Sequence, residues 1–253
     1  MERKLPTPVI IGLVVAGILA CSVFIYFQFQ KLPSTTPPPL ATDAPDFEPA
    51  PVAEPTSTDP ETPDLEGSDE FLRTIASRVS EHPRFTAWIA ENSGLVRRFV
   101  AAVDNVARGE SPRAHLGFLA PQGSFRASED ANGFTIDPRS FGRYDILTEV
   151  VISLETAEAI RVYDQLEPLF DEAYRELGYP DKSFTPTFLT ALDHVLETPI
   201  PPDDIALERR LKSYHYEDPN LESLSDAQKH YLRFGADNIR QLHAKLRLLR
   251  TTF

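Results

Sequence analysis

Apolar residues form one uninterrupted run near the start of the chain. Residues 9–29 are 21 positions without a charged side chain, and almost all of them are apolar. At the rise of an α-helix, about 20 such residues cross the ~30 Å hydrocarbon layer of a bilayer. The pattern therefore predicts a membrane anchor over residues 1–31, with a transmembrane helix at about residues 9–29.

The charges on either side of this run predict its orientation. Two basic side chains and the α-amino group precede it, whereas Lys31 is the only positive charge that follows it before Arg73. Because positively charged flanks stay in the cytoplasm, we expect the N-terminus there and the rest of the chain across the membrane. The alternative is a lipoprotein anchored at Cys21, which ends the tetrapeptide ILAC. The apolar run continues through residues 22–29, and this favours the uncleaved anchor.

Prolines and acidic residues replace the apolar pattern after the anchor. Residues 32–66 contain ten prolines and eight acidic residues, and they contain no Lys, Arg or His. Such a segment buries too little apolar surface to offset the entropy of ordering it. We therefore expect residues 32–67 to be an acidic, Pro-rich, disordered linker.

From Ser68 onward, apolar residues recur at the three- and four-residue spacing of helices, so residues 68–253 are expected to form a mostly helical globular domain. We expect Ser68 to cap the first helix and Gly235 to separate or bend the last one. Pro168 should kink the longest helix or divide it at Glu167. The predicted helices cover about residues 68–79, 83–92, 94–108, 137–154, 156–177, 183–199 and 225–249.

One stretch of this domain has the two-residue period of strands. Apolar and polar residues alternate on both sides of Asn132-Gly133, which predicts a β-hairpin over about residues 125–136. A similar alternation suggests a third strand over residues 207–216. The predicted fold class is therefore mostly α, with an N-terminal transmembrane helix, a disordered linker and a helical domain that carries a small β-hairpin or short sheet.

The charge balance excludes one class of function. The chain has a formal net charge of −13, and residues 67–253 hold 22 basic and 29 acidic side chains. Non-specific binding to nucleic acid depends on clustered Lys and Arg that neutralise phosphates, so no nucleic-acid partner is expected. Cys21 is the only cysteine, which rules out a disulfide within the chain.

The sequence DNVARGESPRAH, residues 104–115, gathers many chemically capable side chains. One interpretation is a helix end, a turn and a new helix start, with a surface ion pair between Asp104 and Arg108. In the other, guanidinium groups bind an anionic ligand or a carboxylate of a partner. The candidate ligand- or partner-binding residues are Arg97, Asp104, Asn105, Arg108, Glu110, Arg113 and His115.

Motifs of known enzymes are missing from the sequence. It contains no GxSxG, GxxxxGK[ST], GxGxxG or HExxH, and its six histidines include no pair at a metal-binding spacing. We therefore assign no catalytic residue, no metal and no cofactor, and regard an enzyme as the less favoured class. An envelope hydrolase or transferase with a site between Asp104 and His115 stays open as an alternative.

The end of the chain is its one basic element. Residues 229–250 carry six Lys or Arg against a single acid, Asp237. The ordinary interpretation is a solvated helix face with cations near a helix C-terminus. The functional alternative is binding of anionic cell-wall or lipid groups.

Four segments together resemble a known family. Residues 97–121, 178–184, 193–201 and 224–249 are similar in sequence and order to the bacterial family catalogued as domain of unknown function 3014. That family has no assigned reaction, and its usual layout also has an anchor and a Pro-rich tether. The resemblance implies a single-pass protein of the bacterial inner membrane. The leading hypothesis is that its periplasmic domain is an interaction or scaffolding module for an unidentified envelope protein.

Overall fold

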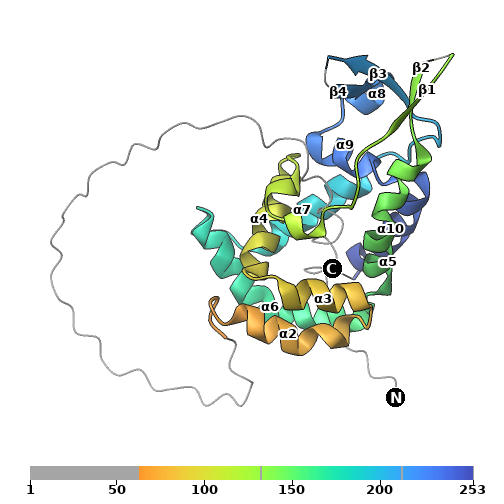
Figure 1. Ribbon diagram of the computed structural model, residues 1–253. Coiled ribbons are helices and arrows are strands. Elements are labelled where there is room, and N and C mark those ends of the chain that lie inside the picture. Colours follow the sequence, from red (N-terminus) through yellow and green to blue (C-terminus); the bar gives the residue numbers. More distant parts are fainter. Residues whose placement is uncertain (1–62, 132, 212, 253) are drawn as a thin grey trace, which may run out of the picture.

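The described part of the chain folds mainly into helices and adds one small antiparallel sheet (Figure 1). The computed structural model describes residues 63–131, 133–211 and 213–252. The predicted anchor at residues 9–29 and nearly all of the predicted linker lie outside these ranges. Within them, no helix combines the length and the apolar character needed to cross a bilayer.

The helices and strands follow the predicted order with two differences among the helices. The helix expected over residues 137–154 begins only at Asp145, after two 3₁₀ turns, and a short helix at Pro219–Glu222 was not predicted. The α-helices are α2 (Ser68–Val79), α3 (Pro83–Glu91), α4 (Leu95–Ala107), α5 (Asp145–Ser153), α6 (Thr156–Glu176), α7 (Phe184–Leu196), α8 (Pro219–Glu222), α9 (Asp226–Leu232) and α10 (Gly235–Arg250). Short 3₁₀ turns are η1 (Pro112–Ala114), η2 (Gly117–Leu119), η3 (Pro138–Ser140) and η4 (Gly142–Tyr144). The strands are β1 (Ala127–Asp130), β2 (Gly133–Ile136), β3 (Ala206–Arg210) and β4 (Ser213–Tyr216).

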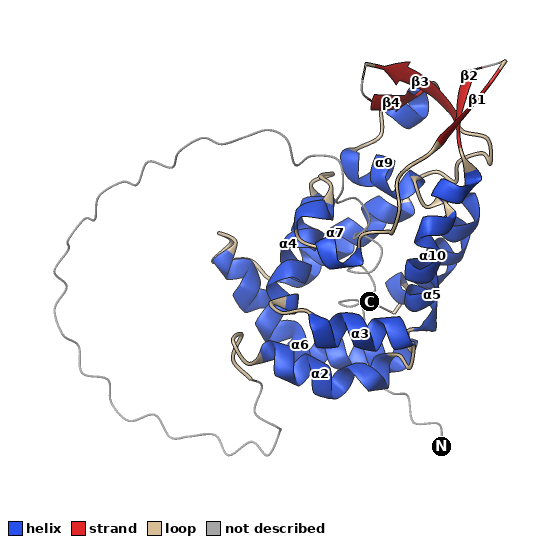
Figure 2. Ribbon diagram, viewed as in Figure 1, coloured by secondary structure: helices blue, strands red, loops and turns tan. Residues whose placement is uncertain are grey.

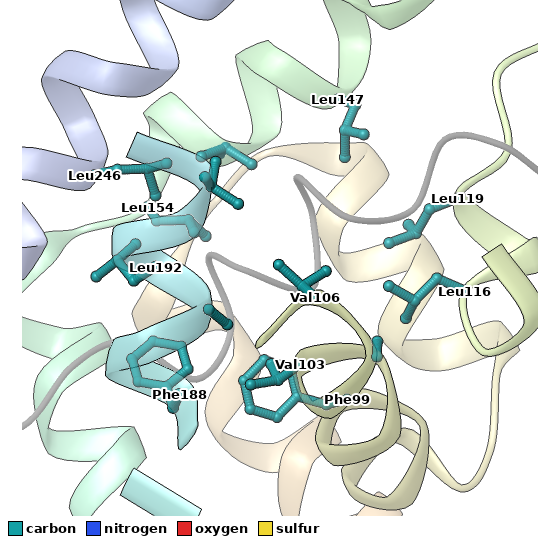
Figure 3. Packing of buried hydrophobic residues seen from close by; sticks show 14 of the residues in the cluster. Phe99, Val103, Val106, Leu116, Leu119, Leu147, Leu154, Phe188, Leu192 and Leu246 are labelled. Carbon is teal, nitrogen blue, oxygen red and sulfur yellow. The ribbon is translucent and has the colours of Figure 1, made fainter. Parts of the chain in front are cut away.

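Helix α4 occupies the centre of the helical body and packs against α6, α7 and α2. The Phe99 ring lies 5.2 Å from that of Phe170 in α6 and 5.7 Å from that of Phe184 in α7, measured between ring centroids. Figure 3 shows side chains of α4 between α7 on one side and the segment with Leu116 and Leu119 on the other. Nine of the 13 residues of α4 are buried, which makes this helix the core of the domain.

Helix α10 closes the core from the opposite side. Its apolar residues at three- and four-residue spacing, Ile239, Leu242, Leu246 and Leu249, have no exposed surface. The helix packs against α5 and α7. Its last residue, Arg250, donates to both carboxylate oxygens of Asp193 in α7, at 2.7 and 3.0 Å. The predicted separation at Gly235 is confirmed, because α9 ends at Leu232 and α10 begins at Gly235.

The four strands form one antiparallel sheet in the order β1-β2-β3-β4, which extends away from the helices (Figure 2). The predicted hairpin is β1 with β2, paired from Ala127–Ile136 to Asp130–Gly133. The predicted single strand at residues 207–216 is wrong: the chain reverses after Leu211, and β3 and β4 form a second hairpin. Nothing in Leu211-Lys212 resembles a favoured turn pair, so the alternation alone could not reveal this reversal.

Two local predictions about helices are also corrected. Helix α6 runs from Thr156 to Glu176 without a break at Glu167, with Pro168 inside it. Pro168 is exposed, so the carbonyl that lacks its usual N–H donor is near water rather than in the core. Ser68 does not cap α2; it is the first helical residue, and its hydroxyl donates to the carbonyl of Leu65 at 2.7 Å.

Gly235 sits where the chain passes closest to an aromatic ring. Its φ of +80° lies in the left-handed region that favours glycine. A Cβ at this position would stand 2.7 Å from Cγ of Phe141. Both the backbone angle and the ring therefore exclude a side chain here.

We predict that Gly235→Ala lowers the free energy of unfolding by about 3 kcal/mol, because it adds overpacking to the cost of a left-handed alanine. Gly94→Ala is the matched control. Gly94 has a φ of +65° but no atom within 4 Å of an added Cβ, so about 1 kcal/mol is expected. Urea denaturation measures both values. Equal losses at the two positions would contradict the proposed clash, whereas Phe141→Ala in the Gly235→Ala background should restore part of the loss.

Candidate functional site

The seven candidate residues do not form one patch. Arg97 contacts the end of α6, whereas Asp104, Asn105, Arg108 and Glu110 form a network at the end of α4. Arg113 lies in η1 on the side of α9, and His115 follows it.

Arg97 is held by two carboxylates. Its Nε donates to Glu176 Oε2 at 2.7 Å, and its Nη2 donates to Glu66 Oε1 at 2.7 Å and to Glu176 Oε1 at 3.0 Å. The hydrogen bonds from Glu176 and then Glu66 raise the pKa of Arg97 above its ordinary value. Arg97 therefore ties α4 to the last residue of α6, and its charge is already balanced within the domain.

The opening of the polar segment is a helix terminus with a defined geometry. Gly109 adopts a φ of +76° directly after the helix. Its N–H donates to the carbonyl of Val106 at 2.8 Å, and the N–H of Glu110 donates to the carbonyl of Asn105 at 2.7 Å. These two bonds define a Schellman motif, which satisfies the last carbonyls of a helix. The backbone geometry thus agrees with the interpretation of this segment as a helix end followed by a turn.

The side chain of Arg108 crosses this turn. Its Nη2 donates to Asn105 Oδ1 at 2.8 Å and lies 3.3 Å from Glu110 Oε2. Its Nη1 lies 3.0 Å from Asp104 Oδ2. The predicted ion pair between Asp104 and Arg108 is therefore present. It is not a pair of two surface side chains, because the Arg108 side chain is 46% exposed but the Asp104 side chain only 9%. Burial is the largest single influence and lowers the pKa of Arg108, but the charges of Asp104 and Glu110 together with Tyr179 leave this pKa raised above its ordinary value.

A second helix end meets the first one. Gly178, with a φ of +103°, ends α6, and the N–H of Tyr179 donates to the carbonyl of Tyr174 at 3.4 Å. The rings of Tyr174 and Tyr179 stack at 4.4 Å, which is the contact that usually accompanies a Schellman motif. The Tyr179 hydroxyl donates to Asp104 Oδ2 at 3.5 Å and accepts from Arg108 at 3.4 Å. Tyr179 is thus part of this network, and sequence reasoning missed it.

The turn after α4 is also fastened to α9. The carbonyl of Gly109 accepts from the N–H of Ala227 at 3.0 Å, and the Ser111 hydroxyl lies 3.1 Å from Nδ1 of His230. Ser225, which caps α9, is bonded to Nε2 of His194 in α7 at 2.8 Å. The segment therefore joins three helices, and this accounts for much of its density of polar side chains.

Arg113 and His115 differ from the other candidates. Among the described residues, no carboxylate forms an ion pair with Arg113. Burial and then the nearby charge of Arg233 lower its pKa. Burial, followed by the charges of Arg108 and Arg98, also lowers the pKa of His115. His115 is therefore neutral near pH 7, and it does not add a charge to the other candidates.

The main hollows of the domain lie elsewhere. A polar groove of about 540 Å³ lies between α5 and α10, and an apolar cavity of about 60 Å³ lies between α3 and α5; neither is lined by residues 104–115. Within residues 63–131, 133–211 and 213–252, no group of three or more His, Cys, Asp or Glu is arranged to hold a metal ion. The side chains of Asp104, Arg108 and Glu110 pair with one another, an arrangement that gives the hydrolase or transferase alternative no support.

Most cations of the basic C-terminal segment are also engaged within the domain. Two of the six, Arg233 and Arg247, form no ion pair with the residues that the structure describes. The interpretation as a solvated helix face agrees with α10, because Arg240 and Arg247 are exposed and Arg247 and Arg250 lie in its last turn. The other four have these contacts: Lys229 with Glu222 and Asp226, Arg240 with Asp237, Arg250 with Asp193, and Lys245 with the carbonyl of Leu154 and the hydroxyl of Thr156.

The fold and the paired polar segment define a mostly helical domain with a small projecting sheet. The family model described as a protein of unknown function, DUF3014, matches residues 95–250, from the first residue of α4 to the last of α10. The chain belongs to this family, and the resemblance seen in the sequence is confirmed. Comparisons with curated proteins and with solved structures gave no match.

We predict that Asp104→Asn lowers the free energy of unfolding by about 1–2 kcal/mol, because it removes the charge that Arg108 faces in a buried position. Glu110→Gln serves as the control. Its side chain is 60% exposed, so a change of at most about 0.5 kcal/mol is expected. Chemical denaturation at pH 7 measures both. A loss for Glu110→Gln as large as that for Asp104→Asn would show that burial does not decide the strength of these pairs.

Proposed function

We propose that the chain is a single-pass membrane protein whose helical domain docks an envelope protein through the tip of its four-stranded sheet. The observation that carries this proposal is Leu211, which is 100% exposed at the turn between β3 and β4. A leucine without any covering side chain is unusual at the end of a projecting hairpin, because its apolar surface gains nothing from folding.

The backbone at Leu211 strengthens the argument. Its φ of +42° makes Leu211 the one non-glycine residue with a positive φ in the described ranges. Glycine or asparagine adopts this conformation at lower cost, whereas a side chain such as leucine is strained there. Leucine is therefore unfavourable at this turn, both for its backbone angle and for its exposure to water. A residue of this kind is expected where the side chain inserts into a partner.

An aromatic strip leads from the helices toward this tip. The Tyr214 ring lies 5.9 Å from that of Phe125 and 5.6 Å from that of Phe134. The guanidinium of Arg209 stands over the Phe134 ring at 5.8 Å. Aromatic and Arg side chains of this kind contribute much of the binding energy in protein interfaces. We expect the partner to offer an apolar recess for Leu211 and a carboxylate near Arg209.

The polar segment at residues 104–115 is a weaker choice for the contact. Arg97 and Arg108 face carboxylates of their own domain, at 2.7 and 3.0 Å. A partner carboxylate would have to replace these groups, and exchanging one ion pair for another yields little binding free energy. At the sheet tip, Arg210 is paired with Glu208 at 2.6 Å, whereas within the described ranges no carboxylate forms an ion pair with Arg209.

The anchoring part of the proposal rests on the sequence of residues 9–29 and on the linker that follows. A linker of 35 residues spans ~35 Å as a flexible coil and ~110 Å if fully extended. The domain could therefore meet a partner well away from the bilayer. The inner membrane, with the N-terminus in the cytoplasm and the domain in the periplasm, is the location that the flanking charges favour.

Fractionation of the whole chain tests the anchor. We expect the full chain to stay with bacterial membranes after alkaline carbonate washing, and a chain that begins at Pro63 to be released. External protease should digest the domain in spheroplasts, which places it in the periplasm. Cys21→Ser distinguishes the two anchors, because it should leave an uncleaved helix in place but prevent lipid attachment. Cleavage of the natural chain before residue 21 that is abolished in Cys21→Ser would favour the lipoprotein, and a digestion-resistant domain would contradict the proposed orientation.

Leu211→Gly tests the docking surface. Because glycine relieves the strained left-handed backbone angle, we expect Leu211→Gly to raise the free energy of unfolding by about 0.5–1 kcal/mol. The variant should nevertheless lose its partner. Photo-crosslinking from position 211 in intact membranes, with position 248 as the control, identifies the contact. Leu248 is exposed to 54% but lies on α10, away from the sheet. Adducts of equal yield at both positions, or partner capture that survives Leu211→Gly, would refute the sheet tip as the docking surface.

A further inference from the structure

The polar groove between α5 and α10 is lined by acids from three parts of the chain. Asp145 and Glu149 belong to α5, Asp203 to the segment before β3, and Asp237 to α10. No Lys, Arg or His is among the described residues that line it. Its volume of about 540 Å³ is in the range of sites for small molecules. We call this hollow, with its four carboxylates, the acidic groove.

The helical repeat and one hydrogen bond bring the polar groups of the groove together. Asp145, Thr148 and Glu149 stand at positions i, i+3 and i+4 of α5, so they share one face of this helix. From α10, Nδ2 of Asn238 donates to Asp145 Oδ1 at 2.9 Å. Thr148 and Asn238 are buried, whereas the two acids of α5 are exposed. The groove therefore has carboxylates at its rim and two neutral polar side chains at its base.

The hydroxyl of Thr148 is the unusual group at this base. Its Oγ1 is buried and has no hydrogen-bond partner in the part of the chain that the structure describes. A threonine inside a helix often bonds the carbonyl four residues before it, and Thr148 does not. Leaving a buried hydroxyl unpaired is unfavourable. A polar group that enters the groove would therefore gain a hydrogen bond that the domain alone leaves unmade.

The protein balances only part of the negative charge of the groove. Asp237 pairs with Arg240 at 2.5 Å, and Glu149 lies 4.0 Å from Nε2 of His82. The other two carboxylates of the groove form no ion pair with any described residue. A cation that enters the groove is therefore attracted by carboxylates whose charge no neighbouring cation offsets.

The groups at the base suit an ammonium group better than a metal ion. Within the described ranges, no three acids or histidines are arranged to hold a metal. Both hydrogens of the Asn238 amide are donated, to Asp145 and to the carbonyl of Phe234 at 3.1 Å, so it offers a ligand only its oxygen. The Asp145 carboxylate and the Thr148 hydroxyl are two further acceptors. These three oxygen acceptors match the three N–H donors of an ammonium group.

We propose that the acidic groove binds a small polyamine, a flexible methylene chain with an ammonium group at each end. One ammonium binds at Asp145, Thr148 and Asn238. Four carboxylates exceed what a single positive charge balances, and Asp203, on another element, attracts the second ammonium. The half-buried ring of Phe141 also lines the groove and contacts the methylene groups. This site is separate from the sheet tip that we propose for docking a protein.

Titration of the full chain tests the site. The protein is purified in a neutral detergent and titrated with putrescine, spermidine and spermine by calorimetry, at a constant ionic strength near that of the cell. Thermal unfolding at increasing spermidine concentration is the second readout. Mg²⁺ is the control cation, because the acidic residues 32–66 also attract positive charge. We expect saturable binding of spermidine at one site and a rise in Tm that Mg²⁺ does not reproduce.

Matched acid variants locate the binding. Asp145→Asn should weaken spermidine binding by about tenfold, because it removes the charge of one acceptor and preserves its shape. Asp226→Asn is the control and should change the affinity by less than about twofold. Asp226 is also an exposed acid in the first turn of a helix, but it does not line the groove. Circular dichroism of each variant checks that the helices remain.

Thr148→Val separates a binding role from a structural one. Valine has a similar size and replaces the unpaired hydroxyl by a methyl group, so the variant without polyamine should have an unchanged or higher Tm. Its affinity for spermidine should nevertheless fall by about threefold or more, because one acceptor of the ammonium is gone. A purely structural hydroxyl would give the opposite pair of results, a lower Tm and an unchanged affinity.

The pattern across the variants decides the proposal. Spermidine binding that weakens in Asp145→Asn and in Thr148→Val, but not in Asp226→Asn, supports it. Equal binding by all three variants would place the polyamine on other acidic surfaces and overturn the proposal. An equal rise in Tm with Mg²⁺ would do the same. A trilysine peptide that binds when no polyamine does would also overturn it, because the groove would then recognise a protein segment.

Discussion

Burial of α4 on nearly all of its sides is the constraint on which the rest of the domain depends. Phe99 lies between the rings of Phe170 and Phe184, and Val100 and Val103 have no exposed surface. A helix surrounded in this way cannot leave its terminal carbonyls to water, so its last turn needs partners from the protein. The backbone N–H groups of Arg108, Gly109 and Glu110 supply them, and the left-handed conformation of Gly109 makes this geometry possible. The polar sequence that first suggests catalysis is therefore largely explained by the depth of the helix that precedes it.

The same need explains why two helix ends meet. Helix α6 ends with the same motif as α4, and Tyr179, which follows its glycine, reaches Asp104. The buried carboxylate of Asp104 is then shared between a guanidinium and a hydroxyl, which reduces the cost of its burial. Because these groups are already paired with one another, we propose that recognition of a partner or ligand uses other surfaces. The sheet tip at Leu211 shares no residue with the network at the end of α4.

Local patterns predicted most of the helices and the first hairpin, but they predicted neither α8 nor the 3₁₀ turns η3 and η4. Contacts between distant residues were not accessible from them. The spacing of Leu242, Leu246 and Leu249 predicted α10, and Gly178 marked the end of α6. The expected division of α6 at Glu167 is wrong because Pro168 lies on the exposed side of the helix, where the lost backbone hydrogen bond costs less. Which side of a helix is exposed follows from packing and not from residue spacing. For the candidate site, proximity in sequence grouped Arg113 with Arg108, whereas the fold places η1, which contains Arg113, beside α9. One signal in the sequence could have indicated the role of Tyr179. A glycine that ends a helix favours contact between the residue after it and the last turn of the helix, and Gly178 has Tyr179 after it and Tyr174 in that turn.

The position of α10 has a consequence for how the domain is made. Its apolar residues fill the space between α5 and α7, which precede it by many residues in the chain. As the chain emerges N-terminus first, the apolar faces of α5 and α7 therefore stay uncovered until the residues up to Arg250 are available to fold. Early helices such as α2, α3 and α4 can form from local contacts, but the nascent domain remains open and prone to aggregation. A chaperone that protects such intermediates would act on this chain before its last helix is released, and not on the finished fold.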